Sequence, residues 1–135
     1  MSQWDEILSI SSGATCAFRE NRGGGRSGMQ SVLNVLDNRA KKNGTTIYVE
    51  ATKKWQFSSM TAPGDPQLTL YVNEDDPEWP LMSLALNLAQ SAWEGQLNDI
   101  TDGATSYYAA SMSEPPDWAA SMTKTVEIEG QIFFK

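Results

Sequence analysis

Carboxylates are the acid–base groups that this chain can use near neutral pH, because its 135 residues include no histidine and one cysteine. A serine or cysteine nucleophile would lack its usual histidine base, and a zinc site would lack its usual nitrogen and sulfur ligands. We therefore expect no catalytic triad, no metal centre and no cofactor. The single thiol, Cys16, lies in an apolar stretch and is expected to be a buried spectator.

Among the acids, Glu20 has the setting that best suits catalysis. It ends an apolar helix pattern and precedes the three glycines Gly23–Gly25, which let a backbone approach a ligand closely. Arg19 and Arg22 lie one and two positions away, so on a helix they need not face it. From spacing alone, a surface salt bridge remains the alternative to catalysis. Surface or turn positions are expected for Glu74, Asp75, Asp76, Glu78, Asp99, Asp102, Glu127 and Glu129.

Three helices are expected to position these groups. Apolar residues at spacings of three and four predict helices over residues 5–22, 27–42 and 80–94, and Gly95 is expected to cap the third. Polar residues of the second helix are expected largely away from its apolar face: Gln30, Asn34, Asp37, Asn38 and Lys41.

The rest of the chain carries weaker patterns. Residues 45–60 have the propensities of both strand and short helix, so their type stays open. Residues 61–80 are rich in proline and predict a surface excursion. Residues 102–110 are strand-like, and residues 124–135 predict a hairpin that turns at Glu129–Gly130.

Helices first and a small antiparallel sheet late predict an α+β fold. A chain of this length buries one core most economically, so residues 1–135 are expected to form a single domain.

Charge and hydropathy limit the partners. A net charge of −7 argues against nucleic acid, whose binding requires clustered lysines and arginines. No apolar run approaches the roughly 20 residues that a membrane helix needs, so membrane insertion is not expected. Asp5 and Glu6 interrupt the N-terminal apolar residues, which argues against a signal peptide and predicts synthesis in the cytoplasm.

Five segments follow one another along the chain: ENRGGGRSGMQSVLNVLDNR, WQFSS, AWEG, DITDGATSYYAA with PPDWA, and VEIEGQIFFK. In this order they resemble the SleB-type cell-wall hydrolase domain of spore-cortex-lytic enzymes and phage lysins. The resemblance spans about Arg19 to Lys135.

This resemblance implies a lysozyme-like fold that cleaves the bond between N-acetylmuramic acid and N-acetylglucosamine in peptidoglycan, commonly as a lytic transglycosylase. It identifies Glu20 as the catalytic acid. The expected supporting and substrate-binding residues are Gln56, Ser58, Thr105, Tyr107 and Tyr108. Tyr107 and Tyr108 should face opposite sides of a strand, so at most one of them lines the cleft.

Two positions depart from the family pattern: Gly24 replaces a second glutamate, and Gln131 replaces a histidine. These losses, with the acidic net charge, leave open a catalytically impaired relative that binds glycan or serves in a virion. A hydrolytic muramidase is a second alternative. A retaining glycosidase needs another carboxylate roughly 5 Å away, and none is evident, which favours a single-acid mechanism. The expected partner is the peptidoglycan strand, reached by holin-dependent release or from a virion, and the oligomeric state stays open.

Overall fold

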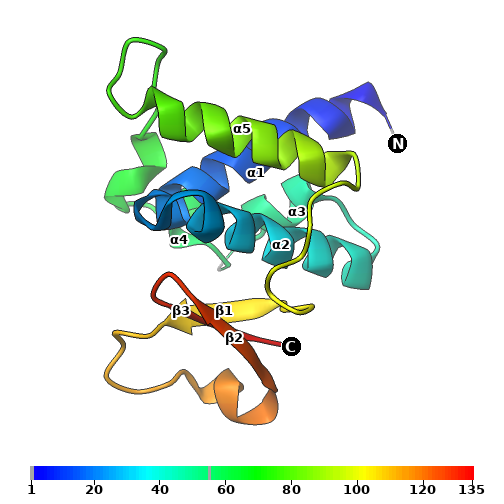
Figure 1. Ribbon diagram of the computed structural model, residues 1–135, viewed down its shortest axis with the longest axis vertical. Helices are drawn as coiled ribbons and strands as arrows, with labels where there is room; N and C mark the ends of the chain where they lie inside the picture. Colours follow the sequence, from blue (N-terminus) through cyan, green and yellow to red (C-terminus); the bar gives the residue numbers. More distant parts are fainter. Residues whose placement is uncertain (1, 55) are drawn as a thin grey trace.

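In the computed structural model, residues 2–54 and 56–135 are described, so Met1 and Trp55 of the WQFSS segment lie outside the described residues. The α-helices come first and the strands last (Figure 1). The α-helices are α1 (Gln3–Asn21), α2 (Gly25–Asn43), α3 (Ile47–Thr52), α4 (Ser58–Thr61) and α5 (Trp79–Trp93). The strands are β1 (Ser106–Ala109), β2 (Lys124–Ile128) and β3 (Gln131–Phe134). The predicted α+β fold is confirmed.

Helix α1 begins two residues earlier than predicted because Ser2 caps it. The Ser2 hydroxyl accepts a hydrogen bond from the Asp5 backbone N–H at 3.2 Å, and the Asp5 carboxylate accepts one from the Ser2 N–H at 3.0 Å. This reciprocal pair satisfies backbone donors that the first turn would leave unpaired. The helix ends at Asn21, and a short 3₁₀ turn over Arg22–Gly24 leads into α2.

Helix α2 is buried on both sides, since every residue from Gly28 to Leu36 is buried. One side packs against α1 and α5, while Val35 contacts a second apolar cluster with Ala104 and Phe133 under the sheet. Figure 1 shows α2 between α5 and the strands.

Gln30 and Asn34 are among these buried residues, so the polar side that the sequence predicted for α2 is covered here rather than open to solvent. Both side-chain amides donate to the Asn98 carbonyl, at 2.9 and 3.1 Å, and Asn34 Oδ1 accepts from the Ile100 N–H at 3.0 Å. One turn later, Asn38 Nδ2 donates to the Ala104 carbonyl at 2.9 Å. A row of amides on α2 therefore holds the connection between α5 and β1.

Residues 45–60, whose type the sequence left open, contain the short helix α3 and most of the short helix α4, which ends at Thr61. Thr46 caps α3 by accepting a hydrogen bond from the Val49 N–H at 3.3 Å. Ile47 and Ala51 are buried in the main core, and α3 packs on α1. Burial of this face overrides the strand propensity of the threonines and β-branched residues.

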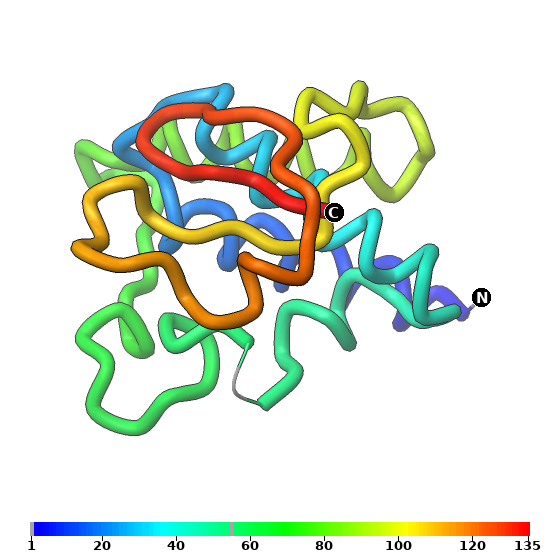
Figure 2. The backbone as a smooth tube through the Cα atoms, turned by 90° about the horizontal axis from the view of Figure 1, so that it is seen from below, coloured from blue at the N-terminus to red at the C-terminus, as the bar shows by residue number. Residues whose placement is uncertain are grey.

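The sheet has the strand order β1-β3-β2 and is antiparallel throughout. Its hairpin turns at Glu129 and Gly130, whose φ angles are 46° and 80°, as a two-residue turn of the predicted kind requires. Figure 2 shows the strands in front of the helices when the molecule is seen from the sheet side.

The close approach of α1 and α2 depends on Gly28. A Cβ atom there would lie 2.8 Å from the Asn21 carbonyl oxygen, so Gly28→Ala should lower the free energy of unfolding by about 1–3 kcal/mol. Gly23→Ala is the matched control, because a Cβ at Gly23 meets nothing within 4 Å. Urea unfolding of the three proteins tests this. Equal stability of the two variants would contradict the tight crossing.

Candidate active site

The Glu20 carboxylate is held by two hydroxyl groups from distant segments. It lies in the last turn of α1 and is partly buried. Ser59 Oγ, in α4, donates to Glu20 Oε2 at 2.7 Å, and the Tyr107 hydroxyl, on β1, donates to Glu20 Oε1 at 2.7 Å. Each carboxylate oxygen therefore has one neutral donor.

The neighbouring arginines are engaged elsewhere. Arg19 donates to the backbone carbonyls of Ser59 and Leu70, at 2.9 and 3.2 Å. Arg22 Nε forms an ion pair with Glu78 at 2.9 Å. Among the described residues, no ion pair includes Glu20. The salt bridge considered from the sequence is thus not formed among the described residues.

Glu20 lines a hollow of about 340 Å³, which Arg22, Gly23, Glu78 and Leu81 also line. The hollow contains a second carboxylate, that of Glu78, in the loop before α5. From the sequence, Glu78 was expected at the surface with the other loop acids. Its contact with Arg22 joins residues 56 positions apart, which no local pattern indicates. The site therefore offers one carboxylate held by hydroxyls and another held by a guanidinium.

Tyr107 and Cys16 both keep their protons at neutral pH. Burial raises the pKa of the Tyr107 phenol well above its usual value, and the charge of Glu20 raises it further. Burial also raises the pKa of the Cys16 thiol, with a smaller contribution from Glu20. The prediction that Cys16 is buried is confirmed. Tyr107 is consequently a hydrogen-bond donor to Glu20 throughout the physiological pH range.

The other predicted site residues lie around this centre without touching Glu20. Ser58 is exposed at the start of α4, so Ser59 is the serine that the structure brings to the carboxylate. Tyr108 points to the opposite side of β1 from Tyr107 and stacks on Phe134, with ring centroids 5.5 Å apart. The expected division of the two tyrosines between the faces of the strand is thus observed.

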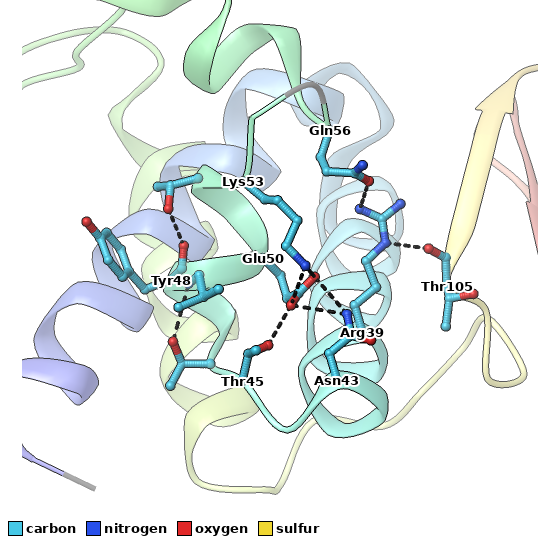
Figure 3. Close-up of polar contacts among 11 residues, drawn as sticks. Arg39, Asn43, Thr45, Tyr48, Glu50, Lys53, Gln56 and Thr105 are labelled. Carbon is cyan, nitrogen blue, oxygen red and sulfur yellow. Dashed lines mark hydrogen bonds and ion pairs between the residues drawn. The ribbon is translucent and has the colours of Figure 1, made fainter.

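Gln56 and Thr105 are joined by Arg39 of α2 (Figure 3). Arg39 Nη1 donates to Gln56 Oε1 at 2.9 Å, Arg39 Nε donates to the Thr105 carbonyl oxygen, and the guanidinium lies 5.3 Å from the centre of the Phe57 ring. Arg39 thereby fixes the segment before α4 relative to the start of β1. In the sequence, Arg39 is marked only by its place at the end of the segment ENRGGGRSGMQSVLNVLDNR, which resembles the family, and nothing there indicates this role.

Gly24, which replaces the second glutamate of the family pattern, is closely packed. A Cβ atom there would lie 2.9 Å from both Asn21 Oδ1 and Glu129 Cβ. The turn between β2 and β3 packs directly against this glycine, so the chain has no room for an acidic side chain without rearrangement. Gln131 begins β3, opposite Ala109 and Ile128.

Glu50 is a buried acid that the sequence did not single out. Its carboxylate accepts hydrogen bonds from Thr45 Oγ1, from Asn43 Nδ2 at 3.3 Å and from Lys53 Nζ at 3.1 Å (Figure 3). Burial acts to raise the pKa of Glu50, but the hydrogen bonds from Thr45, Lys53 and Asn43 outweigh it and lower the pKa below its usual value. Glu50 therefore ties the end of α2 to α3.

Asp99 organises the turn that leads to β1. Its carboxylate accepts from the Thr101 hydroxyl at 2.6 Å and from the Gly103 N–H at 2.9 Å. Burial acts to raise the pKa of Asp99, and hydrogen bonds from Thr101, Asn38 and Gly103 lower it by more. The expected turn position of Asp99 is confirmed.

No cluster of three or more cysteine, aspartate or glutamate side chains among the described residues could hold a metal ion. No helix within the same residues has the length and hydropathy needed to cross a bilayer.

Comparisons with known proteins identify the family and the fold of the chain. Residues 23–134 match the family model described as cell wall hydrolase, a segment that covers most of the chain and begins just after Glu20. Among solved structures, the chain is similar to the catalytic domain of the germination-specific lytic transglycosylase SleB from Bacillus anthracis. The TM-score is 0.69, with 23% identity over 100% of this chain and 97% of that one. This likeness confirms the expected lysozyme-like fold. Among curated proteins, no significant sequence match was found.

The Glu50 network generates a prediction about pH. Glu50→Gln should lower the free energy of unfolding by about 1–3 kcal/mol near neutral pH, since it weakens three hydrogen bonds to a buried charge. Because the folded-state pKa is lowered, this stability is present above the unfolded-state pKa of about 4.3 and is lost as the pH falls through the folded-state value.

Urea unfolding at about pH 7, 5 and 3 would measure this difference between wild type and variant. Exposed Glu127 on β2 supplies the control, Glu127→Gln, which should leave stability nearly unchanged at every pH. A wild-type-to-variant difference that stays constant down to the lowest pH would contradict the proposed ionisation of Glu50.

Proposed function

Since this chain belongs to the cell wall hydrolase family, we propose that it degrades peptidoglycan by cleaving the bond between N-acetylmuramic acid and N-acetylglucosamine. The observation that carries this proposal is the Glu20 carboxylate, held by Ser59 and Tyr107 at the edge of a hollow. The similar SleB domain is described as a lytic transglycosylase, which favours that reaction type here.

In the proposed reaction, Glu20 donates a proton to the glycosidic oxygen while the bond from that oxygen to the muramic anomeric carbon breaks. The acetamido group of the substrate stabilises the resulting sugar cation. Glu20, now a carboxylate, takes the proton of the muramic 6-hydroxyl group. The oxygen of that hydroxyl group bonds to the anomeric carbon at the same time. One C–O bond is broken, one is formed, no water is consumed, and the proton returns to Glu20.

Ser59 and Tyr107 act as positioning residues in this scheme. Their hydrogen bonds favour the carboxylate that remains after the proton has moved, and they fix the direction of both oxygens. Tyr107 can do this because burial and Glu20 keep its phenol protonated. Gln56 and Thr105 lie farther along the same two segments, where they could contact substrate groups away from the cleaved bond.

A hydrolytic muramidase is the second candidate, and Glu78 is the observation that favours it. Glu78 lines the same hollow as Glu20, so its carboxylate could orient a water molecule toward the anomeric carbon. Its ion pair with Arg22, at 2.9 Å, holds it at the wall of the hollow. The two candidates differ in the product and in the need for Glu78.

Digestion of purified peptidoglycan by wild type, Glu20→Gln and Glu78→Gln tests both candidates. A transglycosylase should release anhydromuropeptides about 18 Da lighter than the hydrolytic products, because the elements of water are not added. Glu20→Gln should lower the rate by at least about 100-fold, while Glu78→Gln should retain most activity. Mass spectrometry of the products and the release rate provide the measurements.

Reducing ends with loss of activity in Glu78→Gln would support the muramidase instead. Unchanged activity of Glu20→Gln would overturn the role of Glu20. If folded wild type retained glycan without releasing any product, a catalytically impaired glycan-binding protein would replace both candidates.

The two hydroxyl groups can be tested with neighbouring residues as controls. Ser59→Ala and Tyr107→Phe should each lower kcat by about tenfold or more, because each removes a hydrogen bond to a charged group. Ser58→Ala and Tyr108→Phe should change it by less than about twofold, since both side chains lie away from Glu20. Circular dichroism would verify that all four variants fold. If Ser58→Ala lost activity while Ser59→Ala kept it, Ser58 would be the positioning residue instead. The same reasoning applies to Tyr108→Phe and Tyr107→Phe.

A further inference from the structure

A second hollow, of about 350 Å³, lies beside the candidate active site, between α2, α3 and the start of β1. Three cations line it, together with one acid: Arg39, Lys42, Lys53 and Glu50. The lining thus has an excess of positive charge, in a chain whose net charge is −7. Figure 3 shows Arg39, Glu50 and Lys53 from this region.

The single acid is already engaged. Glu50 is buried, and its carboxylate accepts hydrogen bonds from Thr45, Asn43 and Lys53. Its charge therefore balances Lys53 within the wall of the hollow. The charges of Arg39 and Lys42 are not paired with a carboxylate in the part of the chain that the structure describes.

Arg39 has neutral partners only. Its guanidinium donates to the Gln56 side-chain oxygen and to the Thr105 carbonyl, and no carboxylate within the described residues forms an ion pair with it. Burial lowers the pKa of Arg39, although Tyr107 and Glu50 act in the opposite direction. A bound anion would stabilise the charged guanidinium.

Lys42 lies on the exposed side of the same helix, and no ion pair among the described residues includes it. The adjacent Lys41 differs, because it pairs with Asp37 at 2.9 Å and lines a different hollow. Lys42 is therefore a free cation at the rim, and Lys41 is a natural control for it.

Both segments that reach Glu20 continue into this hollow. Thr105 comes just before β1, and its N–H donates to the Phe134 carbonyl of β3, so it continues the strand about 6.5 Å from Tyr107. Gln56 precedes Ser59 by three residues. A group attached to a sugar near Glu20 can thus reach the cations without leaving the surface formed by these segments.

We infer that this hollow binds a carboxylate of the peptide attached to muramic acid in peptidoglycan. The inference rests on the proposed function. The glycan itself presents neutral hydroxyl and acetamido groups, which need no cation, whereas the attached peptide carries carboxylates that a guanidinium and an ammonium group can pair. Recognition of the peptide beside the cleaved bond would select muramic acid over glucosamine on one side of that bond.

The test compares Lys42→Gln with Lys41→Gln on two substrates, both freed of teichoic acid. One is intact peptidoglycan, and the other is the same glycan after an amidase has removed its peptides and the lactyl carboxylates exposed by that hydrolysis have been converted to amides. Lys42→Gln should raise KM on intact peptidoglycan by about three- to tenfold with little change in kcat, since it removes uniform binding. On the stripped glycan it should match wild type. Lys41→Gln should match wild type on both.

An equal effect of Lys42→Gln on the two substrates, an equal effect of Lys41→Gln, or no effect at all would overturn the inference. A third sample, the intact cell wall with its teichoic acid retained, serves as a further control. An effect of Lys42→Gln that appears only on this sample would also overturn the inference, because the ligand would then be phosphate.

A binding measurement separates this inference from the proposed function. Calorimetric titration of wild type and Lys42→Gln with a soluble disaccharide–tetrapeptide, and with the same compound amidated at its carboxylates, needs no turnover. Weaker binding of the amidated compound to wild type, with no such difference in Lys42→Gln, supports the carboxylate site even if no cleavage is found. Equal binding of the two compounds by wild type would overturn it.

Discussion

The burial of α2 on both sides is the constraint on which the rest of the structure depends. A helix in this position cannot turn its polar residues to solvent, so each buried amide must find a partner or cost about 1–3 kcal/mol. Gln30, Asn34 and Asn38 find theirs in the backbone between α5 and β1. The same contacts fix where β1 begins, and this position brings Tyr107 to Glu20.

The electrostatics of the centre follow from how the chain distributes its cations. Arg19 contacts backbone carbonyls and Arg22 contacts Glu78, so neither neutralises Glu20. Hydroxyl donors take the place that a cation would fill elsewhere. They orient both oxygens of the carboxylate, as the proposed role of Glu20 requires.

Much of the fold could be predicted because its signals are local. Apolar spacing predicts the long helices α1, α2 and α5, and the residues Glu129–Gly130 predict the hairpin turn. The segment that forms α3 and α4 could not be assigned, because tertiary burial decides between its competing propensities. Spacing along α2 places its amides away from the apolar face, but periodicity cannot show that a second layer covers that side.

The candidate site was predictable only in part, for the same reason. Glu20 stood out by its place at a helix end, but its partners are contributed by segments 39 and 87 residues away. The choice between two adjacent serines depends on the rotation of a four-residue helix, which no pattern in the sequence specifies. Glu78 was assigned to the surface because its ion pair with Arg22 is equally long in range.

Protonation of a glycosidic oxygen by Glu20 is the central step of the proposed function. A crystal structure of the Glu20→Gln variant with a bound oligosaccharide of alternating N-acetylglucosamine and N-acetylmuramic acid tests this most directly. We predict that the glycosidic oxygen on the muramic anomeric carbon lies within about 3.2 Å of the side-chain amide at position 20. An oligosaccharide bound at full occupancy with no glycosidic oxygen near that side chain would contradict it.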